Sequence, residues 1–129
     1  MVPSVTVEKL RVAQDARGYV FEPISGDGIA QFRNTHVVYT LPGCVRGNHY
    51  HTRGTEVCSV AGPTLVKYQV ADRVHEAQVP GGEVWRFTFP AGVAHAFRNE
   101  GAEPNMLASF STEEHDPRNP DVVRVVLIP

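Results

Sequence analysis

The chain has 129 residues, of which 42% are hydrophobic and 20% charged, and its formal net charge is −2. This length suits one core, so we take residues 1–129 as a single domain. The charge balance excludes a basic surface for nucleic acid, and the composition excludes a disordered or fibrous chain. No apolar run approaches about eighteen residues, and no signal-like segment opens the chain. We therefore expect a cytoplasmic protein with no membrane partner.

Short strand-like segments follow one another along the chain. Residues 5–12 alternate loosely before a turn at 15–18, and residues 32–41 are rich in β-branched and aromatic side chains. Further strands are predicted by their alternation or β-branched content over residues 57–61, 64–70, 75–79 and 83–89. Turn signals recur every eight to twelve residues or so, and no long window keeps a helical period. The pattern predicts an antiparallel sandwich or barrel with little helix.

The last part of the chain divides into two segments. Residues 112–121 are polar and interrupted by proline, which predicts a loop with one helical turn. Residues 122–128, VVRVVLI, predict a closing strand. The apolar positions expected to build the core are Val38, Val45, Val60, Leu65, Val84, Trp85, Phe87, Phe97, Leu107 and Phe110.

The chain contains two cysteines, Cys44 and Cys58. This number is too small for a disulfide scaffold. The two residues could face each other across neighbouring strands, but we expect free thiols.

Three potential metal ligands lie within residues 46–56, RGNHYHTRGTE. His49 and His51 are two residues apart, so an extended chain directs both side chains to the same face. A polar segment containing one glycine then leads to Glu56 and can return its carboxylate toward both imidazoles. A fourth ligand, His95, follows a second turn, in PAGVAHAFRN. These four residues are the candidate metal ligands.

The two segments resemble the cupin motifs G(x)5HxH(x)3-4E(x)6G and PxGxxHxxxN. The matching positions are Gly43, His49, His51, Glu56, Pro90, Gly92, His95 and Asn99. Two glycines depart from the pattern: Gly62 comes one residue early and Gly82 stands two residues too far ahead of the second motif. Neither is a ligand. The resemblance implies a double-stranded β-helix, the cupin jelly roll, which brings distant ligands together inside a barrel.

A narrower resemblance is carried by RGNHYH, VAHAFRNEG and DPRNPDV. These segments are similar to the metal-binding C-terminal cupin of capsular polysaccharide and O-antigen sugar-nucleotide epimerase/reductases. No GxGxxG segment opens the chain, so we expect a stand-alone cupin. The resemblance implies zinc and a role in epimerisation of a nucleotide-linked keto sugar.

The donor set itself restricts the metal. Three imidazoles and one carboxylate suit Zn, Fe, Mn, Ni or Cu and are poor ligands for Ca or Mg. Four protein ligands leave positions of an octahedron open for water or substrate. The donor types do not choose among these metals, and the family resemblance favours one zinc ion per chain.

Strand alternation selects candidate substrate contacts. If His95 points inward, so should Phe97, whereas Arg98 should point to solvent. Simple alternation sends Arg46 away from the metal, unless Gly47 introduces a β-bulge that turns it back. We nevertheless predict Arg46 as a contact for a sugar diphosphate, because arginine binds phosphate through two hydrogen bonds.

The remaining polar and aromatic candidates have simpler interpretations. His36, His75 and His115 are expected to be surface or hydrogen-bonded core residues. Asn99 is expected to end a strand and not to bind metal. For the aromatic side chains, a place in the core is favoured over a platform for a sugar ring: Tyr39, Tyr68 and Trp85.

Three functions fit these observations. The first is a metal-dependent epimerase or isomerase for a nucleotide-linked keto sugar in polysaccharide biosynthesis. The second is a metal-dependent dioxygenase, and the third is a non-catalytic small-molecule-binding or sensor cupin. No proton-transferring residue is identified from the sequence. Because edge strands need cover, we also expect a homodimer.

Overall fold

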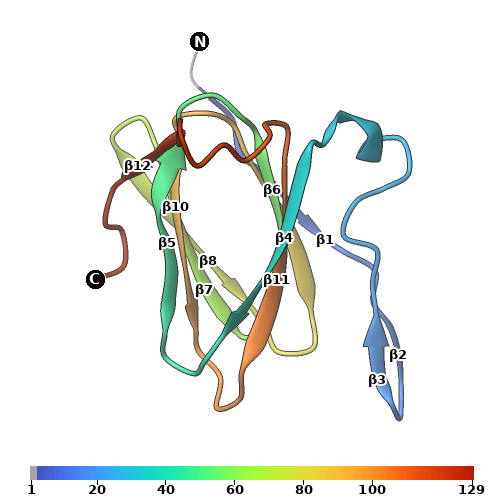
Figure 1. Ribbon diagram of the computed structural model, residues 1–129. Helices are drawn as coiled ribbons and strands as arrows, with labels where there is room; N and C mark the ends of the chain where they lie inside the picture. Colours follow the sequence, from blue (N-terminus) through green and yellow to red (C-terminus); the bar gives the residue numbers. More distant parts are fainter. Residues whose placement is uncertain (1–2) are drawn as a thin grey trace.

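The computed structural model describes residues 3–129, which form two facing β-sheets and a small projecting hairpin (Figure 1). The first sheet has the strand order β1-β9-β6-β11-β4. Its strands are β1 (Thr6–Lys9), β9 (Val84–Phe89), β6 (Glu56–Ala61), β11 (Asn105–Ser111) and β4 (Asn34–Thr40). Each neighbouring pair in this sheet is antiparallel.

The second sheet has the strand order β12-β5-β10-β7-β8 and is also antiparallel. Its strands are β12 (Val122–Arg124), β5 (Val45–His51), β10 (Ala94–Asn99), β7 (Thr64–Val70) and β8 (Arg73–Val79). The hairpin pairs β2 (Ala13–Asp15) with β3 (Gly18–Val20). A single 3-10 turn, η1 (Ile29–Gln31), precedes β4.

The chain moves between the two sheets as it runs from β4 to β12. Strands β4, β6, β9 and β11 belong to the first sheet, whereas β5, β7, β8, β10 and β12 belong to the second. This exchange is the connectivity of a jelly roll, in which the chain passes from one sheet to the other at every step here except the β7–β8 hairpin. The antiparallel jelly roll predicted from the sequence is confirmed.

The core lies between the inner faces of the sheets. Phe87 and Phe89 of β9 are almost fully buried, and their rings stack with centroids 5.9 Å apart. Each buried phenylalanine contributes roughly 2–3 kcal/mol through removal of apolar surface from water. Of the predicted core residues, six are buried: Val60, Leu65, Val84, Phe87, Phe97 and Leu107. The other four are only partly buried: Val38, Val45, Trp85 and Phe110.

The predicted closing strand is too long. Regular pairing with β5 ends at Arg124, and the chain then leaves the sheet. The side chain of Asn48 accepts hydrogen bonds from the amides of Leu127 and Ile128 and donates one to the carbonyl of Ile128. Ile128 is 1% exposed and packs with Leu65 and Ala96. The last residues therefore form a plug against the second sheet instead of a strand.

The predicted helical turn in residues 112–121 is also wrong. This segment contains turns and bends, including one in which the Asp116 carboxylate accepts the amide hydrogen of Arg118. Such side-chain bonds compete with helix formation, and Pro117 and Pro120 further restrict the backbone.

Two simpler predictions are confirmed. Cys44 and Cys58 are free, the first exposed and the second buried. Asn99 ends β10, where its buried side chain bonds the carbonyls of Thr40 and Glu103 and the amide of Gly101.

Within residues 3–129 no helix has the length and apolar character needed to cross a bilayer.

Candidate metal centre and active-site cavity

A β-bulge in β5 determines which side chains face the barrel interior. On β10, His95 pairs with His49 and Ala96 with Gly47, so Asn48 is an extra residue on β5. Gly47 and Asn48 have φ values of 83° and 60°. The extra residue reverses the alternation of the strand, and Arg46 therefore shares the inward side with His49.

Gly47 is required at this bulge for a steric reason. A Cβ added there would lie 2.7 Å from the carbonyl oxygen of His95, and a positive φ already disfavours other residues. The close approach of β5 and β10 at this point keeps their histidines side by side.

Four side chains from three strands meet at one end of the barrel. His49 and His51 come from β5, Glu56 begins β6, and His95 lies on β10. One potential ligand atom from each residue lies within 4.8 Å of those from the other three. The ring centroid of His49 is 5.0 Å from the ring centroid of His51 and 5.0 Å from that of His95. The structure thus brings together the four residues predicted as metal ligands.

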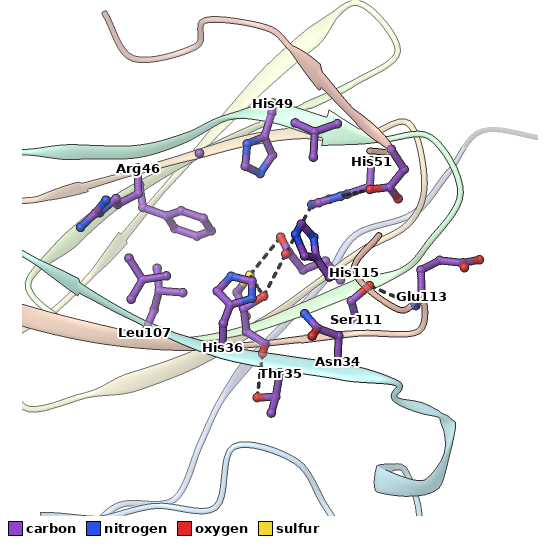
Figure 2. Close-up of a pocket in the computed structure, with 18 of the residues that line it drawn as sticks. Asn34, Thr35, His36, Arg46, His49, His51, Leu107, Ser111, Glu113 and His115 are labelled. Carbon is purple, nitrogen blue, oxygen red and sulfur yellow. Dashed lines mark hydrogen bonds and ion pairs between the residues drawn. The ribbon is translucent and has the colours of Figure 1, made fainter. Parts of the chain in front are cut away.

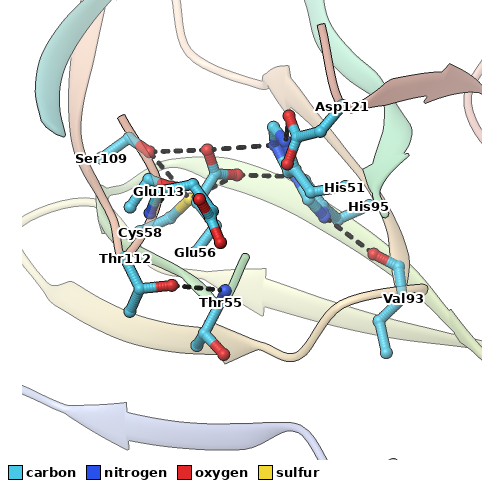
Figure 3. A network of polar contacts seen from close by, with 11 residues as sticks. His51, Thr55, Glu56, Cys58, Val93, His95, Ser109, Thr112, Glu113 and Asp121 are labelled. Carbon is cyan, nitrogen blue, oxygen red and sulfur yellow. Dashed lines mark hydrogen bonds and ion pairs between the residues drawn. The ribbon is translucent and has the colours of Figure 1, made fainter. Parts of the chain in front are cut away.

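Glu56 faces two of the histidines, His51 and His95, which lie on the same side of its carboxylate (Figure 3). Its carboxylate oxygens are 2.8 Å from Nε2 of His95 and 3.4 Å from Nε2 of His51. Despite these short distances, neither nitrogen reaches a hydrogen-bonding geometry with any described residue, and both are buried. Two ring nitrogens therefore point into the cluster with no satisfied protein partner.

Other residues orient the candidate ligands through ring atoms that face away from the cluster centre and through a carboxylate oxygen. Nδ1 of His51 is 3.1 Å from the carboxylate of Asp121, and Nδ1 of His95 is 3.1 Å from the carbonyl of Val93. Donation of a proton from Nδ1 leaves Nε2 available as a metal ligand. The hydroxyl of Ser109 donates to Glu56 over 2.9 Å, which fixes the carboxylate in turn.

The histidines of the cluster differ in electrostatic environment. Contact with Glu56, which outweighs desolvation, raises the pKa of His51 to about 9. Burial, with repulsion from His95 and His51, lowers the pKa of His49 to about 4. Burial alone would raise the pKa of Glu56, but its contacts with His51 and His95 outweigh that effect and hold it well below the ordinary value. Without a metal, the cluster thus carries a proton on His51.

These residues fit a divalent transition metal. Ligands around zinc lie at about 2.0–2.2 Å, so opposite donors can be about 4.4 Å apart at most. The observed limit of 4.8 Å requires only a small contraction. The two buried nitrogens without hydrogen bonds would become ligands, and the proton on His51 would be released. The cluster could therefore hold a metal ion.

An open cavity of about 470 Å³ lies beside the cluster and is lined by His49, His51 and Glu56 (Figure 2). Phe97 and Arg46 also line it, and Phe97 is only 6% exposed. The guanidinium of Arg46 donates to the carbonyl of Tyr39 at 2.7 Å. Arg98, by contrast, pairs with Glu100 outside the cavity, as alternation predicts.

Sequence reasoning missed several residues of this cavity. His36 and His115 line it, although they were expected to be ordinary surface or core histidines. Asp121, which supports His51, was noticed only as part of a motif. Alternation along β4 could have placed His36 inward with Val38, whereas no local pattern indicates the position of His115.

The aromatic predictions give a mixed result. Tyr39 was expected in the core but points outward on β4 and is 54% exposed. Tyr68 and Trp85 pack at the edge of the core cluster, and His75 stacks on Tyr68 with centroids 5.2 Å apart.

The jelly roll with inward-facing HxH, glutamate and histidine residues defines a cupin. Within this class the chain belongs to the family described as polysaccharide biosynthesis C-terminal domain, whose model matches residues 13–123. The chain is also 26% identical over 137 aligned positions to the spore coat polysaccharide biosynthesis protein SpsL of Bacillus subtilis, covering 97% of this chain and 89% of SpsL.

Two solved structures place the fold in a wider context. The capsular polysaccharide assembling protein CapF of Staphylococcus aureus is 25% identical with a TM-score of 0.66, and 90% of this chain covers 32% of CapF. The chain thus spans about a third of CapF. A double mutant of the 3,4-ketoisomerase QdtA of Thermoanaerobacterium thermosaccharolyticum is 20% identical with a TM-score of 0.71, covering 96% of this chain and 89% of QdtA.

Proposed function

We propose that this protein is a metal-dependent epimerase or isomerase that acts on a nucleotide-linked keto sugar in polysaccharide biosynthesis. The observation that carries the proposal is that His49, His51 and Glu56 lie on the wall of an open cavity. A structural metal site is closed by its protein ligands, whereas a catalytic site keeps a position for substrate. The match to the polysaccharide biosynthesis C-terminal domain family and the similarity to SpsL support a function in polysaccharide biosynthesis.

We assign the metal to His49, His51, Glu56 and His95 and expect one zinc ion per chain. When bound, the metal would act as a Lewis acid that polarises the sugar carbonyl and favours loss of a proton from the adjacent carbon. Asp121 keeps His51 in the tautomer that presents Nε2, and Ser109 holds the Glu56 carboxylate. The apolar ring of Phe97 limits access of water to this part of the cavity.

The substrate class follows from the cavity and from its relatives. A cavity of about 470 Å³ accommodates a small molecule but not a polymer chain threaded through it. A histidine-to-asparagine mutant of QdtA has been crystallised with TDP-4-keto-6-deoxyglucose. Arg46 is turned inward by the bulge, and its guanidinium suits a diphosphate, provided that its bond to Tyr39 is exchanged for the ligand.

We further infer that the protein forms a homodimer through the outer side of β4. This strand is the last of its sheet, so one edge of its backbone has no partner strand among the described residues. Beside that edge, Val37, Tyr39 and Met106 are 65%, 54% and 52% exposed. A second copy would cover both the edge and these apolar side chains. Light scattering at micromolar concentration tests this inference, and a monomer would contradict it.

The reaction is tested by hydrogen exchange in deuterated water. Zinc-loaded protein is incubated with nucleotide-linked 4-keto-6-deoxy sugars, including TDP-4-keto-6-deoxyglucose, and deuterium in the sugar ring is followed by NMR. We expect deuterium to enter the carbon beside the carbonyl, to stop entering after chelation of the metal and to resume when zinc is added.

Two results would contradict this proposal. Absence of exchange above the buffer rate with several such sugars, in protein that still binds metal, would favour a binding or sensor cupin. Iron in the purified protein together with substrate-dependent oxygen uptake would favour the dioxygenase.

A further inference from the structure

The cavity wall opposite the three cluster histidines carries a row of polar side chains on the first sheet, the sheet that also holds Glu56. His36 of β4 pairs with Ser109 of β11, and Ser109 pairs in turn with Cys58 of β6. Val38 packs against the core and Thr40 is buried, so alternation directs His36 to the same inner face. The hydroxyl of Ser109 bonds Glu56, which connects this row to the cluster.

The second sheet presents the facing row. There His49 pairs with His95, and His95 pairs with Tyr68. Figure 2 shows His36 on β4 and His49 on β5 pointing toward each other from opposite sides of the cavity. A sugar held between the sheets would therefore have the three candidate histidine ligands on one side and the His36 ring on the other.

Several cavity groups are unsuitable for proton transfer. The four cluster residues are assigned to the metal, and Asp121 is engaged with His51. Burial raises the pKa of the Cys58 thiol well above its ordinary value and keeps it protonated. Glu114 is paired with Arg33.

Among the remaining groups, His36 has the best-defined position. It lies in the middle of a strand that pairs with β11 from Asn34 to Thr40. His115 and Glu113, which also line the cavity, lie in the irregular segment that follows β11. A catalytic group needs a fixed geometry, which a paired strand provides and an irregular segment does not.

We propose that His36 is the proton-transferring residue of this cavity, an assignment that rests on the proposed function. A neutral ring nitrogen of His36 accepts the proton from the carbon adjacent to the ketone. The electron pair of that C–H bond becomes a carbon–carbon π bond, and the carbonyl π pair moves onto oxygen. Return of a proton to the carbon reverses these movements, so no oxidant or reductant is consumed. Imidazole is suited to this exchange because it gains and loses a proton near neutral pH.

The test compares His36→Gln and His36→Ala with His75→Gln, a matched change on β8 outside the cavity. Because the His36 side chain is exposed, its replacement should leave the fold intact. We expect the rate of deuterium exchange to fall by about 10²–10⁴-fold in both His36 variants and to be unchanged in His75→Gln. Zinc content and binding of TDP should match the wild type in all three. Added imidazole should restore part of the exchange in His36→Ala, a rescue that loss of a structural role would not show.

The contrary outcomes are distinct. Exchange at the wild-type rate in His36→Gln, or loss of exchange in His115→Gln with retention in His36→Gln, would overturn the assignment and leave the proposed function standing. Absence of exchange in wild-type, zinc-loaded protein would overturn the proposed function and the assignment together.

Discussion

Strands β5 and β10 both carry histidines of the cluster, but they are held in place differently. β10 lies between two long partners, β5 and β7, and all its residues except Arg98 are buried. β5 is bulged, none of its residues is fully buried, and its outer neighbour β12 spans only three residues. β10 is therefore a fixed support, whereas the position of β5 depends on segments that are distant in sequence.

Those segments attach to β5 at two points. The C-terminal plug is bonded by Asn48 within the bulge, and Asp121 contacts the ring of His51. Local strand propensity does not supply this support. The ligand geometry of β5 therefore depends on residues 121–128, which follow the last cluster residue by more than twenty positions.

The largest effect is expected when β5 loses both ligands. His49→Ala combined with His51→Ala should abolish zinc binding, because only Glu56 and His95 remain. The protein should stay folded, since both rings are only partly buried. Metal content by elemental analysis and far-UV circular dichroism provide the measurement. Unchanged zinc stoichiometry in the double variant would refute the assignment of the site.

A substitution at the bulge tests whether the close approach to β10 matters. Gly47→Ala should lower the free energy of unfolding by roughly 2–4 kcal/mol, because the added methyl meets the His95 carbonyl and φ is positive. Gly43→Ala is the matched control, since its φ is +76° but a Cβ there has no neighbour within 4 Å. It should cost about 1 kcal/mol. If urea unfolding gives equal losses of unfolding free energy for the two variants, the contact between the added methyl group and the His95 carbonyl is unimportant.

The C-terminal plug is tested by Asn48→Gly, which keeps the positive φ but removes the side-chain bonds to Leu127 and Ile128. We expect a loss of about 1–3 kcal/mol and faster amide exchange in residues 125–129. The control is Ala71→Gly, at another residue with positive φ, which should be neutral or slightly stabilising. Unaltered protection of the C-terminal amides would mean that Asn48 does not hold the plug.

The smallest predicted effect is a pH dependence of metal-free protein. The pKa of His51 is raised from 6.5 to about 9, so its stabilising contribution is complete below pH 6.5 and is lost as the pH rises through 9. The pKa of His49 is lowered from 6.5 to about 4, so the protonation of this residue changes the stability only below pH 6.5. It does not contribute to a change between pH 6.5 and 9. Because His51 is partly exposed, we expect a loss of about 1–2 kcal/mol between pH 6.5 and 9.

Zinc should change this pH dependence. A bound metal takes the place of the proton on His51, so zinc affinity should increase over the same range. Thermal unfolding of both forms across this window provides the measurement. Stability of metal-free protein that increases from pH 6.5 to 9 would contradict the environment assigned to His51.

The cluster residues were predictable because their positions depend on short spacings. The two-residue interval between His49 and His51 and the turns before Glu56 and His95 are local features that a strand-rich chain translates directly into geometry. The alternation in residues 83–89 likewise predicted an inward-facing Phe87, and this side chain is fully buried.

Features that depend on a single inserted residue or on distant contacts were not predictable. Gly47 allowed a β-bulge that would turn Arg46 inward, but the sequence did not decide between this bulge and a regular strand; the extra residue at Asn48 shows that the bulge is present. The apolar end of the chain has strand propensity, but Asn48 binds it as a plug and tertiary contacts override that propensity. His36 lies on a predicted strand, yet its role depends on the cavity formed by the opposite sheet.

X-ray absorption spectroscopy of zinc-loaded protein identifies the atoms that bind the metal. We expect a first shell of nitrogen and oxygen alone at about 2.0–2.2 Å, with outer-shell scattering from three imidazoles. This shell corresponds to His49, His51, Glu56 and His95. A sulfur ligand at about 2.3 Å would implicate Cys58 and contradict this ligand set, as would protein that takes up no zinc.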